Sequence, residues 1–216
     1  MKRRYLFLKS ILVLAFSLGF FSTAIYSEQS DMQKLEEGKP LVWTDLSGKA
    51  RRATGKILIN ASGEDCWKVL SDLDTWSEWA PCIKHINTVS KSGNHSIVVY
   101  ESKFLFITVH TTEEVTFDHE NKIISGRQLS DEEVEQYNEM GTLAVKANCT
   151  RDVKETHRLE PYGDKTIWTY SMDTNLKFPA PKVIDSFMCK QVAPGFLKAA
   201  KARVESGTVT ACKEAE

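Results

Sequence analysis

Several sequence patterns that mark common enzyme chemistries are missing from this 216-residue chain. There is no H-E-x-x-H motif, no G-x-S-x-G turn and no glycine-rich phosphate loop, so metalloprotease, serine-hydrolase and nucleotide-binding functions have no support. The five cysteines include no C-x-x-C pair, which removes support for a zinc ribbon or a thioredoxin-like site. We therefore expect no metal, no cofactor and no catalytic residue set.

An excess of positive charge is missing as well. The chain has 28 Lys and Arg residues against 29 Asp and Glu residues. Without residues 1–27, which contain Lys2, Arg3, Arg4 and Lys9, the balance is 24 against 29, a net charge of −5. Proteins that bind nucleic acid carry a basic surface, so we do not expect nucleic acid as a partner.

The longest apolar run is too short to cross a membrane comfortably. It covers residues 11–21, follows a basic start, and is followed by the small residues Ser22, Ala24 and Ser27. This is the layout of a secretory signal peptide. We expect a secreted or periplasmic protein, cleaved after Ala24 or Ser27, with no stable transmembrane span after processing. An uncleaved N-terminal anchor is the alternative.

The sequence has no internal repeat, and about 190 residues beyond the leader suit one domain with a core and a cavity. In an oxidising compartment we expect one or two disulfides, and the odd cysteine count leaves at least one thiol unpaired. One candidate pair is Cys189 with Cys212. The pairing stays open among Cys66, Cys82, Cys149, Cys189 and Cys212. The predicted parts are a signal peptide (1–27), a polar lead-in (28–49), one domain (50–207) and a C-terminal tail (208–216).

Alternation of apolar and polar residues predicts a sheet of antiparallel strands. The long strand-like stretch 96–117 must fold back on itself, and we place its turn near residues 103–106. The other predicted strands are 41–43, 53–60, 83–90, 123–129, 152–160 and 165–175. The predicted short helices are 64–73, 74–79 and an acidic one at 130–138.

A long amphipathic helix is predicted over residues 181–205. Its apolar residues recur at steps of three and four, which places them on one face that must be buried. Pro194 lies in the middle and predicts a kink or a restart. Many strands followed by such a helix predict an α+β fold in which the helix lies across a curved sheet.

Residues 65–81 read Asp-Cys-Trp-Lys-Val-Leu-Ser-Asp-Leu-Asp-Thr-Trp-Ser-Glu-Trp-Ala-Pro. This stretch resembles the first-helix signature of the START-like (SRPBCC) superfamily, which includes polyketide cyclase/dehydratase-like proteins and the coenzyme-Q-binding START-like group. The hairpin residues 159–166 and the closing helix are similar to the family as well. The positions that match the signature are Trp67, Asp72, Trp76, Trp79 and Pro81.

The resemblance implies a helix-grip fold. About six or seven antiparallel strands would wrap around the C-terminal helix, with two short helices after the first strand. A mostly apolar cavity between sheet and helix would hold a hydrophobic small molecule such as a lipid or an isoprenoid. The expected cavity wall consists of bulky residues that share a strand face or the helix face: Tyr100, Phe104, Trp168, Tyr170, Met172, Val183, Phe187, Val192 and Phe196.

Three functions remain open, and the oligomeric state is undetermined. The first is an exported protein that binds its ligand without converting it. The second is a cyclase, dehydratase or hydrolase, which requires an inward acid–base residue with a shifted pKa, and Arg127 and His157 are candidates. His110 is too far along its strand from Glu114 to form a base–carboxylate pair. The third is an envelope protein-interaction or structural module with a filled interior. A cavity volume below roughly 300 Å³ would favour this function.

Overall fold

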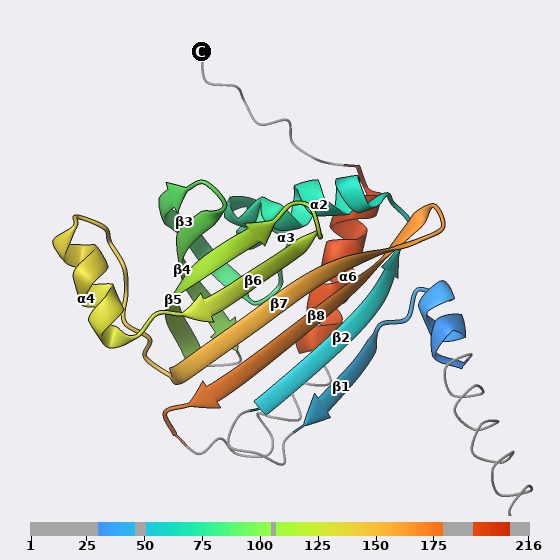
Figure 1. Ribbon diagram of the computed structural model, residues 1–216. Coiled ribbons are helices and arrows are strands. Elements are labelled where there is room, and N and C mark those ends of the chain that lie inside the picture. Colours follow the sequence, from blue (N-terminus) through green and yellow to red (C-terminus); the bar gives the residue numbers. More distant parts are fainter. Residues whose placement is uncertain (1–29, 46–50, 105–106, 179–191, 208–216) are drawn as a thin grey trace, which may run out of the picture. The chain divides into compact units, whose positions relative to one another are not determined.

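The computed structural model describes residues 30–45, 51–104, 107–178 and 192–207 (Figure 1). The chain forms two compact units, Met1–Lys39 and Pro40–Glu216. The described part of the first unit contains a helix over residues 30–36. The predicted leader and tail lie outside the described residues, as do Val183, Phe187 and the candidate pair Cys189–Cys212.

The second unit contains one antiparallel sheet of eight strands in the order β1-β2-β8-β7-β6-β5-β4-β3. The α+β helix-grip prediction is confirmed, with one strand more than the upper expected number. Strand β1 confirms the short strand predicted at 41–43, which lies within the predicted polar lead-in, and its residues Leu41–Asp45 pair with β2. The strands are β1 Leu41–Asp45, β2 Arg51–Ile59, β3 Ile83–Ser92, β4 His95–Phe104, β5 Ile107–Asp118, β6 Ile123–Gln128, β7 Thr150–Tyr162 and β8 Lys165–Leu176.

The turns between strands lie close to where the sequence predicted them. The long stretch folds back between Phe104 and Ile107, as expected. The β7–β8 turn is tighter than predicted, because Pro161 remains in β7 opposite Thr166 and only residues 163 and 164 make the turn. Pro161 is tolerated there because the pairing of β6 with β7 ends at Arg158, so the missing N–H is not needed by a neighbouring strand.

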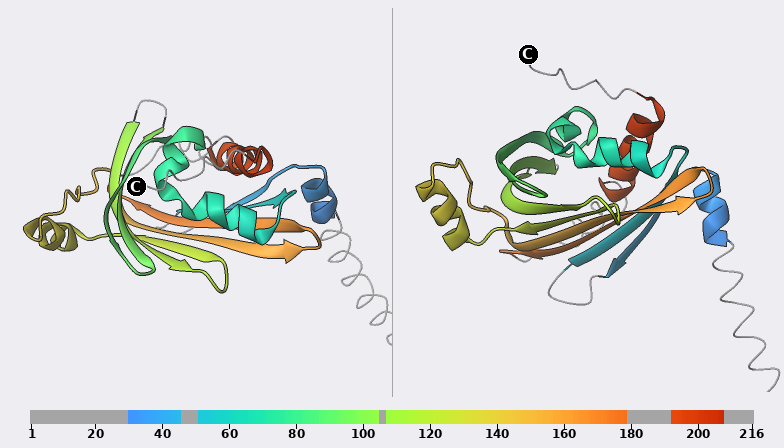
Figure 2. Two further views of the ribbon diagram at one scale, coloured as in Figure 1. Left: turned by 90° about the horizontal axis from the view of Figure 1, so that it is seen from above. Right: turned by 45° about the horizontal axis from the view of Figure 1, so that its top comes forward.

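Four helical segments cover one face of the curved sheet (Figure 2). They are α2 Gly63–Ser71, the short 3₁₀ turn η1 Leu73–Thr75, α3 Trp76–Trp79 and α6 Ala193–Glu205. Ser62 caps α2 by accepting a hydrogen bond from the Asp65 N–H at 3.1 Å. Pro194 lies in the first turn of α6, where its missing N–H costs no helical hydrogen bond. Residues 181–191 of the predicted helix lie outside the described residues, so the predicted kink or restart stays a prediction.

The position of α6 over the sheet depends on a glycine in β2. A Cβ at Gly55 would lie only 2.6 Å from Leu197 Cδ1, so the absence of a side chain lets the helix approach the strand. Leu197 is fully buried in the main core. This core also contains buried side chains of β2, α2, β4, β5 and β8, among them Ile57, Ile59, Leu70, Val98, Val115 and Trp168.

The acidic helix α4, Asp131–Glu139, is confirmed and lies away from the helices that cover the sheet (Figures 1 and 2). Ser130 and Glu133 form a reciprocal capping box at its start. Val134 anchors it in a separate small core with Ile97, Leu129 and Ala144. Within the described ranges, none of the helices combines the length and apolarity that a membrane crossing requires.

Candidate functional site

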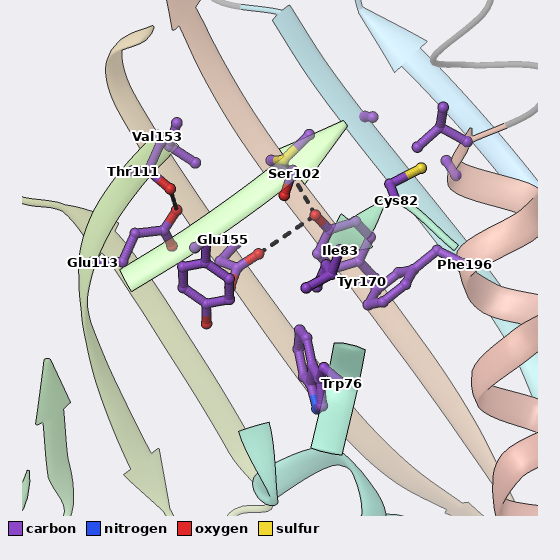
Figure 3. Close-up of a pocket in the computed structure, with 15 residues that line it drawn as sticks. Trp76, Cys82, Ile83, Ser102, Thr111, Glu113, Val153, Glu155, Tyr170 and Phe196 are labelled. Atoms are coloured by element: carbon purple, nitrogen blue, oxygen red, sulfur yellow. Dashed lines mark hydrogen bonds between the residues drawn. The ribbon is translucent and has the colours of Figure 1, made fainter. Parts of the chain in front are cut away.

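A cavity of about 150 Å³ lies between the sheet, α3 and α6 (Figure 3). Side chains from β2, β4, β5, β7 and β8 form its floor and sides, and Trp76 of α3 and Phe196 of α6 lie over it. Its surface is mostly apolar, with a few polar groups. The lining residues are Ala53, Trp76, Cys82, Ile83, Tyr100, Ser102, Thr111, Glu113, Val153, Glu155, Tyr170, Met172, Val192, Ala193 and Phe196.

The structure brings together five of the nine predicted wall residues. Tyr100, Tyr170, Met172, Val192 and Phe196 all line the cavity. Three further predictions concern Val183, Phe187 and the side chain of Phe104, which lie outside the described part of the chain. The ninth residue, Trp168, is fully buried in the core and stacks on His157, with ring centroids 5.7 Å apart. Whether any of the nine contacts a ligand stays a prediction.

Aromatic rings connect the two helices over the cavity. The Phe196 ring stacks on Trp79 and also lies against Trp76, with both centroid distances 5.6 Å. From the other side it meets Tyr170 edge-on at 5.4 Å. Such ring pairs contribute about 0.5–1.5 kcal/mol beyond the area they bury. The cavity therefore has a packed aromatic cover made by residues more than a hundred positions apart in sequence.

Two carboxyl groups face each other inside this apolar space. Glu113 comes from β5 and Glu155 from β7, and Gly126 of the intervening strand β6 lies between them. A Cβ at Gly126 would be 3.1 Å from Glu113 Oε2 and 3.1 Å from Glu155 Oε1. The glycine thus provides the room in which the two carboxyl groups meet.

Glu113 is 6 % exposed. Its Oε1 accepts a hydrogen bond from Thr111 Oγ1 at 3.2 Å, but its Oε2 has no partner in the described part of the chain. Burial, followed by the repulsion of Glu155, raises the pKa of Glu113 well above its ordinary value. The protonated acid is therefore favoured at this position.

Two tyrosines complete the polar part of the wall. The Tyr170 hydroxyl donates to Glu155 Oε2 at 3.4 Å (Figure 3), and the buried Tyr100 hydroxyl has no partner among the described residues. Burial and the nearby Glu155 raise the pKa of both phenols well above the usual range. Both groups therefore remain hydroxyl donors at physiological pH, and Tyr100 has an unused one.

The two candidate acid–base residues from the sequence lie on opposite sides of the sheet. His157 is 1 % exposed, and its Nε2 lies 3.7 Å from Glu155 Oε1, too far for a hydrogen bond. Arg127 points outward and pairs with Glu114 and Glu133. His110, expected to be a solvated strand histidine, is partly exposed with Nδ1 4.0 Å from Glu101.

Glu113 and Glu155 were not identified as inward residues from the sequence. The alternation along each strand could have identified them. Val115 and Phe117 of β5 lie on the same strand face as Glu113, and both are buried. Likewise Val153, His157 and Leu159 of β7 share the phase of Glu155. A carboxylate in the buried phase of a strand is unusual enough to mark a site.

The chemistry available here consists of proton donors and acceptors in a mostly apolar space. Two carboxyl groups and two phenols can hold a proton, orient a polar substituent or balance a positive charge. Within the described ranges, no group of three or more His, Cys, Asp or Glu side chains is arranged to hold a metal ion.

Solved structures share this fold at low sequence identity. An aromatase/cyclase from Streptomyces sp. R1128 has a TM-score of 0.60 at 12 % identity, covering 76 % of this chain and 98 % of its own. A STAR-related lipid transfer protein from Xanthomonas axonopodis has a TM-score of 0.61 at 18 % identity, covering 78 % and 94 %. A START superfamily protein from Mycobacterium smegmatis has a TM-score of 0.59 at 18 % identity, covering 73 % and 99 %. These likenesses establish the fold alone.

Family membership follows from the sequence itself. No curated protein matches the chain. The profile of the family described as "Polyketide cyclase / dehydrase and lipid transport", however, matches residues 50–205, which is most of the chain and the whole of the region that forms the cavity. The chain therefore belongs to the polyketide cyclase/dehydrase and lipid transport family and has its START-like, hydrophobic-ligand-binding fold.

Proposed function

We propose that this protein binds a compact hydrophobic molecule in the cavity under α6 and does not convert it. The proposal rests on an apolar wall that contains two buried polar atoms, Glu113 Oε2 and the Tyr100 hydroxyl, for which the described residues provide no hydrogen-bond partner. A buried polar group without a partner costs about 1–3 kcal/mol. A ligand with one polar substituent would remove that cost, which gives it both affinity and orientation.

The volume limits the size of this ligand. At about 150 Å³ the cavity is half the roughly 300 Å³ at which ligand pockets usually begin. Volume alone thus favours the alternative of a filled structural module. However, an apolar cavity of about 150 Å³ is large enough to bind benzene, and a core that is only structural would gain by satisfying Glu113. We therefore propose a single ring, a short isoprenoid or one end of a lipid as the bound part.

Native mass spectrometry of protein isolated from its own source tests binding directly. We expect a co-purifying small molecule, and uptake of small aromatic or isoprenoid probes by the emptied protein. Filling the cavity by Ser102→Leu should reduce uptake, whereas Ser125→Leu, on an exposed position of β6, should not. A folded protein without a bound molecule that takes up no probe would support the filled module instead.

A second candidate function is acid–base catalysis on the same scaffold. It is favoured by one observation: Glu113 is an inward carboxyl group whose pKa burial raises, beside a second carboxyl group. Such a pair can divide the tasks of general acid and general base. If the protein is an enzyme, the ligand that co-purifies with Glu113→Gln should differ in mass from the one that co-purifies with the unaltered protein, because the variant retains substrate. Identical masses support binding without conversion.

We also propose that the protein is exported and that residues 1–27 are removed. The support is the basic start, the short apolar run and the small residues that follow it. The intact mass of the protein in the extracytoplasmic fraction of its source tests this. A mature N-terminus at residue 25 or 28 is expected, and a chain that keeps residues 1–27 in the cytoplasmic fraction would contradict the proposal.

A further inference from the structure

The cavity is lined by two acidic side chains, and no basic side chain among its described lining residues balances their charge. Glu113 and Glu155 both line it, and none of the described residues that line it is Lys or Arg. His157 has its Nε2 3.7 Å from Glu155 Oε1, but it does not line the cavity. Buried carboxylates are normally paired with a cation. Here the space beside them is open.

Glu113 provides an independent sign that a partner belongs in this space. It is more than nine-tenths buried, and its Oε2 has no hydrogen-bond donor among the described residues. Its other oxygen is held by Thr111, which fixes the carboxyl group at the cavity wall (Figure 3). Leaving that buried oxygen without a hydrogen-bond partner destabilises the fold, so a polar group from outside the chain would offset the cost.

The aromatic wall suits the same kind of partner. Trp76, Tyr100, Tyr170 and Phe196 contribute four rings to the lining. The faces of aromatic rings attract cations, with energies of about 2 kcal/mol or more when the site is dry. Two carboxyl groups and four aromatic rings in one wall form a surrounding that stabilises a positive charge and disfavours a negative one.

We infer that the cavity selects a compact apolar ligand bearing an amine or quaternary ammonium group, with its positive charge seated between Glu113 and Glu155. This inference rests on the proposed function and adds the chemical class of the ligand. A ring of benzene size with one short ammonium arm fits the volume of about 150 Å³. The ammonium group would reach the carboxyl pair while the ring lies under Phe196.

Proton release should accompany binding. The positive charge of the ligand favours the ionised form of Glu113, whose pKa burial and Glu155 raise in the empty cavity. Calorimetry in two buffers of different ionisation enthalpy would measure the released proton at pH 7. The other titratable groups that line the cavity are Tyr170 of β8, Tyr100 of β4 and Cys82 before β3, and His157 of β7 lies 3.7 Å from Glu155.

Three probes with one ring test the inference: benzylamine, benzyl alcohol and benzoate, titrated at pH 7. We expect benzylamine to bind at least tenfold more tightly than benzyl alcohol, since hydrogen bonds to charged groups exceed neutral ones by about this factor. Benzoate should not bind measurably. Glu113→Gln and Glu155→Gln should each weaken benzylamine at least tenfold and leave benzyl alcohol within about threefold. Glu160→Gln, an exposed carboxylate of β7, is the matched control.

The outcomes separate the two proposals. If benzyl alcohol binds as tightly as benzylamine or more tightly, the charge selectivity is wrong and hydrophobic binding stands. If benzylamine binds but neither Gln substitution weakens it, the placement of the charge is wrong. If no probe binds to the folded protein, both the inference and the proposed function are overturned. Retained benzyl alcohol binding by the variants shows that their cavity is intact.

Discussion

Glu113 of β5 and Glu155 of β7 meet over Gly126 of β6, each with a carboxyl oxygen 3.1 Å from the point where a Cβ of that glycine would lie. Three neighbouring strands thus place two acids and the space between them. The relationship depends on sheet register, because Gly126 pairs directly with Glu155. Four predictions follow from this site and from the contacts that support it.

The first prediction concerns Gly126→Ala. The new methyl group would lie 2.8 Å from Glu155 Cγ and would push the carboxyl groups apart. We expect a loss of about 1–3 kcal/mol in the free energy of unfolding, as for other overpacked sites, together with weaker probe binding. Gly63→Ala is the control, because its Cβ would come no closer than 4.0 Å to Thr166 Oγ1. Urea unfolding measures the free energy of unfolding of both variants. Equal losses in the two variants would show that Gly126 is no more crowded than Gly63.

The second prediction concerns the pH dependence of stability. The ordinary pKa of Glu113 is 4.5, and burial raises it well above this value in the folded protein. Between the unfolded and folded pKa the folded state holds a proton that the unfolded state lacks, so stability falls as the pH rises through that window. Glu113→Gln removes this loss. The difference in melting temperature between Glu113→Gln and the unaltered protein should therefore increase from pH 4 to pH 8. The increase should be about 2–4 °C for each kcal/mol of unfolding free energy that the unaltered protein loses.

Thermal unfolding across this pH range checks the second prediction. Glu160→Gln, at the exposed end of β7, should show a flat difference from the unaltered protein. A difference for Glu113→Gln that does not change with pH would mean that Glu113 is ionised in the folded state, contrary to its burial.

The third prediction concerns the contact between Gly55 and Leu197. Gly55→Ala places a methyl group 2.6 Å from Leu197 Cδ1 and should cost about 1–3 kcal/mol, since α6 or its side chain must move. Leu197→Ala alone should cost about 2–5 kcal/mol through the cavity it creates. The double variant should cost clearly less than the sum, because each change relieves the other. Additive losses in chemical denaturation would show that the two residues do not press on each other.

The fourth prediction concerns thiol reactivity. Burial raises the pKa of the Cys66 thiol to about 11, and its side chain is fully buried, whereas Cys149 is partly exposed. Iodoacetamide at pH 8 should therefore modify Cys149 long before Cys66, because the thiolate is the reactive form. Peptide mass mapping over time measures the order. Early modification of Cys66 in the folded protein would contradict its position in the core.

Local sequence patterns were sufficient for most of the fold. The alternation in 96–117 and the limit on strand length placed a turn that the structure has between Phe104 and Ile107. The acidic start of the helix at 130–138 was a local signal of the same kind, and in the structure Ser62 and Ser130 cap α2 and α4 through contacts within three residues. The short strand predicted at 41–43 extends to Asp45 in β1, because pairing with β2 continues beyond the apolar residues Leu41, Val42 and Trp43.

The site was harder to predict, because it depends on contacts between distant residues. Tyr100, Tyr170 and Phe196 were found through their size and their phase on a strand or helix. The meeting of Glu113 and Glu155 depends instead on the register of three strands and on a glycine in the middle one. The volume depends on how Phe196 packs against Trp76, which no periodicity encodes.

The pairing of β2 with β8 has a consequence for how the chain assembles. Arg51 lies opposite Thr174, whereas β3 to β6 each pair with the strand that follows directly in sequence. On a ribosome, β1 and β2 must therefore wait until almost the whole polypeptide has been made, and a two-stranded hairpin is barely stable alone. The cavity forms only when β2 pairs with β8, so nascent chains, or chains truncated before β8, would lack the proposed binding site.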